Sequence, residues 1–146
     1  QEQNMTFANS IGTITSLEDI KDGNYRNHSY FYFIALDPDT TPNLTRKPEG
    51  HYITYYHHGD FETLYRGYDA ILKYAQAHHL ELDAYFYEDL LLSEITVSSV
   101  DDFVVELSIR ILNYPNLDWK NNLCEVIFWL LMQHQFLQVL KMHQHH

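Results

Sequence analysis

The chain has 146 residues, enough for one domain with a hydrophobic core, and 45% of them are hydrophobic against 20% charged. That balance excludes a disordered chain, and the formal net charge of −11 argues against nucleic-acid binding through a basic surface. The single cysteine, Cys124, excludes an internal disulfide framework and fits a reducing, cytoplasmic compartment. The chain has no run of about 18 apolar residues, so we expect no transmembrane helix and no membrane partner.

The first half of the chain carries one helix signal and two strand signals. Ser16 is placed as an N-cap with Asp19 three residues on, and Gly23 can end the turn, so SLEDIK predicts a short helix. Residues His28 to Leu36, HSYFYFIAL, are aromatic and β-branched and predict a strand, and DPDTTPN after them predicts a loop. Gly50 to His57, GHYITYYH, predicts a second strand.

A longer helix and two further strands follow. Asp60 is a good N-cap for a helix from Phe61 to about His79. Its apolar side chains recur every three or four residues, as in a helix that packs on a core: Phe61, Leu64, Tyr65, Tyr68, Ile71, Leu72 and Ala75. Tyr85 to Leu92, YFYEDLLL, predicts a strand, and after the VSSVDD loop Phe103 to Ile111 alternates as a half-buried strand does.

One carboxylate falls where the alternation predicts a buried row. Along YFYEDLLL, Glu88 shares a face with Phe86, Leu90 and Leu92. Burying a lone carboxylate is costly unless something pairs with it. Glu88 therefore predicts a partner, which is either a ligand, a side chain such as Arg66 or Lys73, or water at an edge of the sheet.

These elements predict an α+β fold in which helices lie on one face of an antiparallel sheet. Since the unit from Gly50 to Ile111 would leave a sheet edge and part of a face uncovered, we expect the strand before it to belong to a second, similar half. From about Trp119, with Asp118 as N-cap, the chain predicts a helix. Its stretch LCEVIFWLLM is nearly apolar all round, so this helix must be buried, in the domain or against a partner such as a second copy. The expected division is a domain over 1–113 and a helical extension over 114–146.

Four short motifs occur in order within residues 47–111. They are the strand entry Pro48-Glu49-Gly50-His51-Tyr52, the helix residues Tyr65 and Tyr68, the pair Tyr87-Glu88, and the closing strand Glu106-Leu107-Ser108-Ile109-Arg110-Ile111. In order and spacing this segment resembles the second half of a GyrI-like effector-binding domain, the ligand-sensing module of MerR-family multidrug-responsive transcription regulators. Residues 7–47 resemble the first half more loosely, and its first strand, expected before residue 7, is missing. The resemblance thus implies two pseudo-repeated halves with the first half truncated.

The resemblance also implies a binding site. In that family the Glu matching Glu88 faces a drug cavity and meets lipophilic cations, and an aromatic residue matching Phe103 lines the same cavity. This chain has Phe where a drug-sensing relative has Tyr, so a hydroxyl contact is lost. The remaining candidate walls are Tyr32, Tyr65, Tyr68 and Phe86. The expected ligand is a lipophilic cationic small molecule, with no cofactor, and DNA would be bound only through an N-terminal winged-helix domain that this chain lacks.

Two other classes of function stay open. Some GyrI-like relatives hydrolyse reactive small molecules, and Glu88 with a raised pKa could serve as a general base. We nevertheless expect a binding protein rather than an enzyme, because no motif places a serine or Cys124 beside a base. A stand-alone protein-interaction module, as in gyrase inhibition by the family's namesake, is the other alternative, and the apolar tail favours it.

Histidines occur as the pairs His57-His58 and His78-His79 and in the final HQHH. Adjacent residues do not share a helix face. No cysteine or carboxylate spacing of the zinc kind accompanies the histidines. We therefore expect surface histidines and no metal site.

Overall fold

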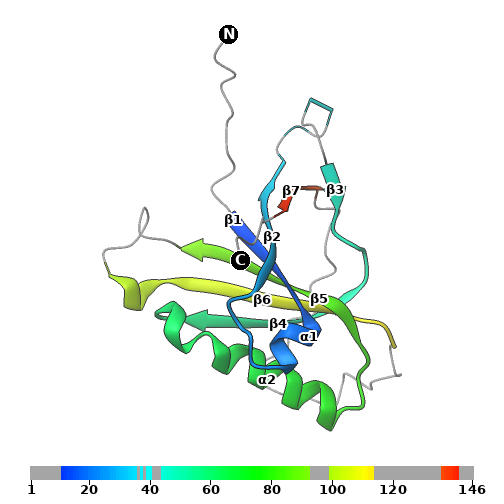
Figure 1. Ribbon diagram of the computed structural model, residues 1–146, viewed down its shortest axis with the longest axis vertical. Coiled ribbons are helices and arrows are strands. Elements are labelled where there is room, and N and C mark those ends of the chain that lie inside the picture. The colour runs from blue at the N-terminus through cyan, green and yellow to red at the C-terminus, as the bar shows by residue number, and fades with distance from the viewer. Residues whose placement is uncertain are drawn as a thin grey trace, which may run out of the picture.

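A computed structural model describes residues 11–35, 37, 39–40, 44–92, 99–113 and 136–141 of the chain. In these residues seven strands form one sheet in the order β3-β7-β2-β1-β5-β6-β4, and every neighbouring pair is antiparallel. The strands are β1 Ile11–Ser16, β2 His28–Ile34, β3 Leu44–Arg46, β4 His51–His58, β5 Leu82–Leu92, β6 Val104–Ile111 and β7 Phe136–Lys141. Figure 1 shows a strong twist, since β4, β5 and β6 run across the view while β2 runs down it.

Both α-helices of the described chain, α1 (Leu17–Lys21) and α2 (Tyr65–Ala77), pack on the same face of the sheet (Figure 1). The core between the helices and the sheet consists of Ile20, Ile53, Leu64, Tyr68, Ile71, Ala75, Leu80, Phe86, Val105, Leu107, Ile109 and Ile111. Gly67 brings α2 close to the sheet, because a Cβ at that position would lie 2.7 Å from side-chain atoms of Leu107 and Tyr55. The predicted α+β class, with helices on one face of an antiparallel sheet, is therefore confirmed.

Both predicted N-caps are present. Ser16 Oγ accepts a hydrogen bond from the Asp19 amide at 3.1 Å and begins α1. Asp60 Oδ1 accepts from the Thr63 amide at 3.1 Å, but it caps a 3-10 turn, η1 (Phe61–Thr63), so α2 begins only at Tyr65. A second 3-10 turn, η2 (Val100–Asp102), leads into β6.

Three strands were not predicted, and the shortest of them, β3, follows directly on the predicted DPDTTPN loop. β1 lies in the middle of the sheet between β2 and β5, although its sequence IGTITS gave no strand signal. β7 falls where a C-terminal helix was predicted, and at Phe136–Lys141 that prediction is wrong. The physical reason is that β7 pairs with the edge of β2, which would otherwise be open, and with β3. The rest of the predicted C-terminal helix lies outside the described residues.

The face of the sheet away from the helices holds a second buried cluster, formed by Ile14, Tyr32, Tyr52 and Tyr87. Tyr32, Gly12 and Asp89 are register partners on β2, β1 and β5. The Tyr32 hydroxyl donates to Asp89 Oδ1, so the ring spans the middle strand above Gly12. A Cβ on Gly12 would lie 2.0 Å from Cζ of that ring, which makes glycine necessary there.

We predict that Gly12→Ala destabilises the fold by about 1–3 kcal/mol, the usual cost of overpacking a buried contact. Chemical denaturation with fluorescence detection measures the free energy of unfolding. In a Tyr32→Ala background the same Gly12 substitution should cost much less, because the ring that its Cβ meets is gone. An equal cost in both backgrounds would contradict the account of Gly12.

Candidate functional site

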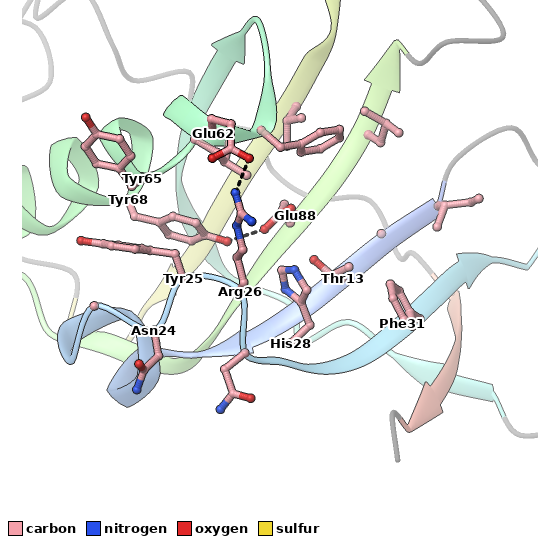
Figure 2. A pocket seen from close by; sticks show the side chains of 18 residues that line it. Thr13, Asn24, Tyr25, Arg26, His28, Phe31, Glu62, Tyr65, Tyr68 and Glu88 are labelled. Carbon is pink, nitrogen blue, oxygen red and sulfur yellow. Dashed lines mark hydrogen bonds and ion pairs between the residues drawn. The ribbon is translucent and has the colours of Figure 1, made fainter. Parts of the chain in front are cut away.

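A cavity of about 1100 Å³ lies on the helix-bearing side of the sheet. Its floor is formed by side chains of β1, β5 and β6, one wall by η1 and the first turn of α2, and another by β2 and the loop of residues 23–27 before it. Figure 2 shows these elements converging on Glu88. Strands thus fix the bottom of the site, while a loop and a helix start form its sides.

Glu88 lies on the floor of this cavity, with 8% of its surface exposed. The predicted alternation is correct, because Glu88 faces the helices together with the fully buried Phe86. Its register partners are Thr13 on β1 and Leu107 on β6. The carboxylate is therefore held by the middle of the sheet, where backbone pairing on both sides leaves it little freedom.

The partner of Glu88 within the protein is a tyrosine and not a cation. Tyr68, on the inner face of α2, donates its hydroxyl to Glu88 Oε2 at 2.5 Å. Phe86 meets the Tyr68 ring edge-on at 5.0 Å between centroids, and Tyr25 stacks on it at 5.8 Å. Among the described residues Glu88 forms no ion pair, and Arg66 lies instead over the exposed ring of Tyr65.

Burial dominates the electrostatics of this pair. Desolvation raises the pKa of Glu88, and the hydrogen bond from Tyr68, the charge of His28 and the nearby Thr13 hydroxyl oppose the rise only in part. The pKa of the Tyr68 hydroxyl is raised too, first by burial and then by the Glu88 carboxylate, so Tyr68 keeps its proton and stays a donor. The site is a carboxylate whose ionised form is only partly stabilised.

Four of the other predicted wall residues lie at or just behind the cavity. Tyr65 and Tyr68 line it directly. Phe86 supports Tyr68 from behind, and Phe103 packs edge-on against Phe61, a lining residue, at 5.7 Å. Of the predicted aromatic walls, Tyr65 and Tyr68 thus line the cavity, whereas Phe86 and Phe103 lie behind lining residues.

Tyr32 was predicted to line the cavity, but the structure does not bring it there. Side chains alternate along β2, and Phe31 faces the cavity instead. Tyr32 is 1% exposed on the opposite face of the sheet, where it bonds Asp89. The strand sequence HSYFYFI is aromatic on both faces, so its pattern could not decide between the two residues.

The loop 23–27 supplies cavity residues that the sequence analysis missed. Tyr25 stacks on Tyr68 and anchors its hydroxyl on Asp69 Oδ1 at 3.1 Å. Arg26 reaches across to Glu62 in η1 with an N–O distance of 2.6 Å, as Figure 2 shows. Both partners are more than 70% exposed, at 72% and 76%, so this ion pair contributes little stability and can open readily.

The paired histidines do not form a metal site with other side chains of the described chain, where no group of three or more His, Cys, Asp or Glu could hold an ion. His57 corrects the expectation of surface histidines, since it is buried. Its Nε2 donates to the Asp60 carbonyl oxygen at 2.8 Å and lies 3.3 Å from the Thr63 hydroxyl. His57 therefore fixes the turn that leads into η1.

Comparisons with protein-family models, with curated proteins and with solved structures find no match for this chain. Within the part of the chain that the structure describes, no helix is both long and apolar enough to cross a membrane.

The raised pKa of Glu88 predicts a specific pH dependence of stability. The folded state holds the proton of Glu88 more tightly than the unfolded chain does, so stability falls as the pH rises from the ordinary value of 4.5 through the raised pKa. Gln has no such proton to lose. We expect the free energy of unfolding of wild type, relative to Glu88→Gln, to decline across that window in denaturant titrations.

The matched control is Glu81→Gln, which changes an exposed carboxylate. Its stability should follow the wild-type curve at every pH. Parallel curves for wild type and Glu88→Gln would mean that burial does not raise the pKa of Glu88.

Proposed function

We propose that this chain is a ligand-sensing domain that binds a lipophilic cationic small molecule at Glu88. The observation that carries the proposal is a buried carboxylate, without an ion pair among the described residues, on the floor of an aromatic-walled cavity. A volume of about 1100 Å³ lies just above the range, about 300–1000 Å³, that small-molecule pockets occupy. Such a cavity favours a ligand whose charge meets Glu88 and whose rings cover the walls.

The charges around the cavity favour a single positive charge on the ligand. Arg26 and Glu62 pair with each other at the rim, which leaves Glu88 as the lining carboxylate that a ligand can neutralise. A neutral ligand would leave that carboxylate buried and unpaired, so the site discriminates against it. Aromatic walls such as Tyr68 and Tyr65 add cation–π attraction, about 0.5–2 kcal/mol for each well-placed ring.

The order of elements supports an assignment to the GyrI-like effector-binding domains. The well-matched part, residues 47–111, runs β4, α2, β5, β6, and the part before it runs β1, α1, β2, β3 in the same order of strand, helix, strand, strand. In this proposal the two runs are the pseudo-repeated halves, and β1 serves as the first strand that the sequence analysis expected to be missing, so the first half is not truncated. In the intact MerR-type regulator, ligand binding would bias the arrangement of a linked winged-helix domain that contacts DNA.

Binding of a rhodamine dye, a fluorescent lipophilic cation, tests the proposal. We expect fluorescence titration to give a micromolar dissociation constant for wild type and at least tenfold weaker binding for Glu88→Gln. Binding to wild type should also weaken as the pH falls through the raised pKa of Glu88, because the protonated acid carries no charge. Glu81→Gln, which removes an exposed carboxylate that does not line the cavity, should bind as well as wild type. Equal binding by wild type and Glu88→Gln would refute the role of Glu88.

A second candidate is a small-molecule hydrolase, which the raised pKa of Glu88 and its 2.5 Å bond to Tyr68 favour. An ionised Glu88 could take a proton from a water molecule that attacks an electrophilic substrate, with the Tyr68 hydroxyl holding the carboxylate in place. Steady release of 4-nitrophenol from 4-nitrophenyl acetate that stops in Glu88→Gln would favour this reading. Release that is unchanged in Glu88→Gln would exclude Glu88 as the base.

A further inference from the structure

The hydroxyl of Thr13 is the one buried side-chain polar atom of the described chain without a hydrogen-bond partner. Buried polar atoms almost always find a partner, and each exception in a folded protein calls for an explanation. Thr13 lies on β1 and lines the same cavity as Glu88. A hydroxyl left unsatisfied inside a cavity is a recognition point for whatever fills the cavity.

The Glu88 carboxylate is also only half satisfied. Oε2 accepts from Tyr68, whereas no described residue donates a hydrogen bond to Oε1. Thr13 is near enough to favour the ionised carboxylate, yet the two groups do not meet the geometry of a hydrogen bond. Glu88 Oε1 and the buried Thr13 hydroxyl oxygen thus both lack a donor at the same end of the cavity.

The sheet holds these two groups side by side. Thr13 and Glu88 are register partners on the antiparallel strands β1 and β5, with their side chains on the same face (Figure 2). Directly opposed residues of such a pair have Cβ atoms about 4.5–5.5 Å apart. One small head group with two N–H donors can therefore span them.

We propose that the ligand's cationic group carries N–H bonds, as a primary or secondary ammonium, an amidinium or a guanidinium does. One N–H donates to Glu88 Oε1 and another to the Thr13 hydroxyl, while the aromatic walls cover the rest of the molecule. A quaternary ammonium satisfies the charge of Glu88 but leaves the Thr13 hydroxyl unbonded. This inference rests on the proposed function, since it names the ligand class of the same cavity and makes Thr13 a specificity-determining residue.

A matched pair of probes separates charge from hydrogen bonding. They are 2-(1-naphthyl)ethylammonium and its N,N,N-trimethyl analogue, which share ring and charge but differ in N–H donors. Calorimetric titration at pH 8 should show the ammonium binding wild type about tenfold more tightly than the trimethyl analogue, as expected for a hydrogen bond to a charged donor.

Thr13→Val is the decisive variant, because Val matches Thr in shape and in β-branching and removes only the hydroxyl. It should weaken ammonium binding about tenfold and leave trimethylammonium binding within twofold, whereas Glu88→Gln should weaken both. Thermal denaturation of Thr13→Val tests whether the variant stays folded. If it does not, Thr13→Ser, which keeps the hydroxyl, is the second variant, and it must retain the wild-type preference for the ammonium.

The failures are distinguishable. If both probes bind wild type and weaken in Glu88→Gln, but Thr13→Val affects neither or both equally, the inference about N–H donors is overturned and the proposed function stands. If neither probe binds wild type, or both bind Glu88→Gln as well as wild type, the proposed function fails and this inference fails with it.

Discussion

The hydrogen bond from Tyr68 to Glu88 joins the helix layer to the centre of the sheet, and the cavity depends on it. Without a donor on α2, the buried carboxylate on β5 would lose the hydrogen bond that Tyr68 donates to it. With this one donor the carboxylate is held in place but remains under-solvated, and its pKa stays raised. Tyr25 and Phe86 both pack against the Tyr68 ring, which holds the donor in position. The fold thus maintains a partly satisfied charge and an open space in front of it.

The neighbouring residue shows what a structural carboxylate looks like in the same strand. Asp89 points to the opposite face of β5, accepts from Tyr32, and feels the ammonium of the buried Lys47, which opposes the rise of its pKa on burial. Lys47 itself lies 4.4 Å from the centre of the Tyr87 ring and 3.2 Å from Ser108 Oγ. Each carboxylate thus feels one positive charge from its own chain, Lys47 at Asp89 and His28 at Glu88, and neither forms an ion pair among the described residues. What distinguishes Glu88 is its place on the floor of the cavity, which Asp89 does not line, and that is the physical reason to place a ligand cation there.

Sequence reasoning located the centre of the site but not its surroundings. The alternation along β5 was enough to predict that Glu88 is buried. The helical spacing of Tyr65 and Tyr68 was enough to predict that both line the same cavity. Thr13 was missed because β1 is short and has a glycine, required by the ring of Tyr32, where a strand pattern needs a large side chain. Arg26 was missed because a loop has no periodicity.

The sequence predicted the locally encoded elements of the fold but not the pairings between distant strands. Local signals gave the caps at Ser16 and Asp60 and the strands β2, β4, β5 and β6, since these depend on residues adjacent in the chain. The pairings of β1 with β5 and of β7 with β2 join segments far apart in sequence. Such pairings are decided by which edges are left open in three dimensions, and no local pattern encodes that.

The most direct test of the central claim is the pKa of Glu88 itself, measured by carbon-13 NMR of its carboxyl group with and without a bound lipophilic cation. Our account predicts that the free protein titrates Glu88 above its ordinary value of 4.5 and that the bound cation lowers the pKa, because the cation stabilises the ionised form. A Glu88 that titrates at its ordinary value, or whose pKa does not respond to a cation that binds, would contradict the account.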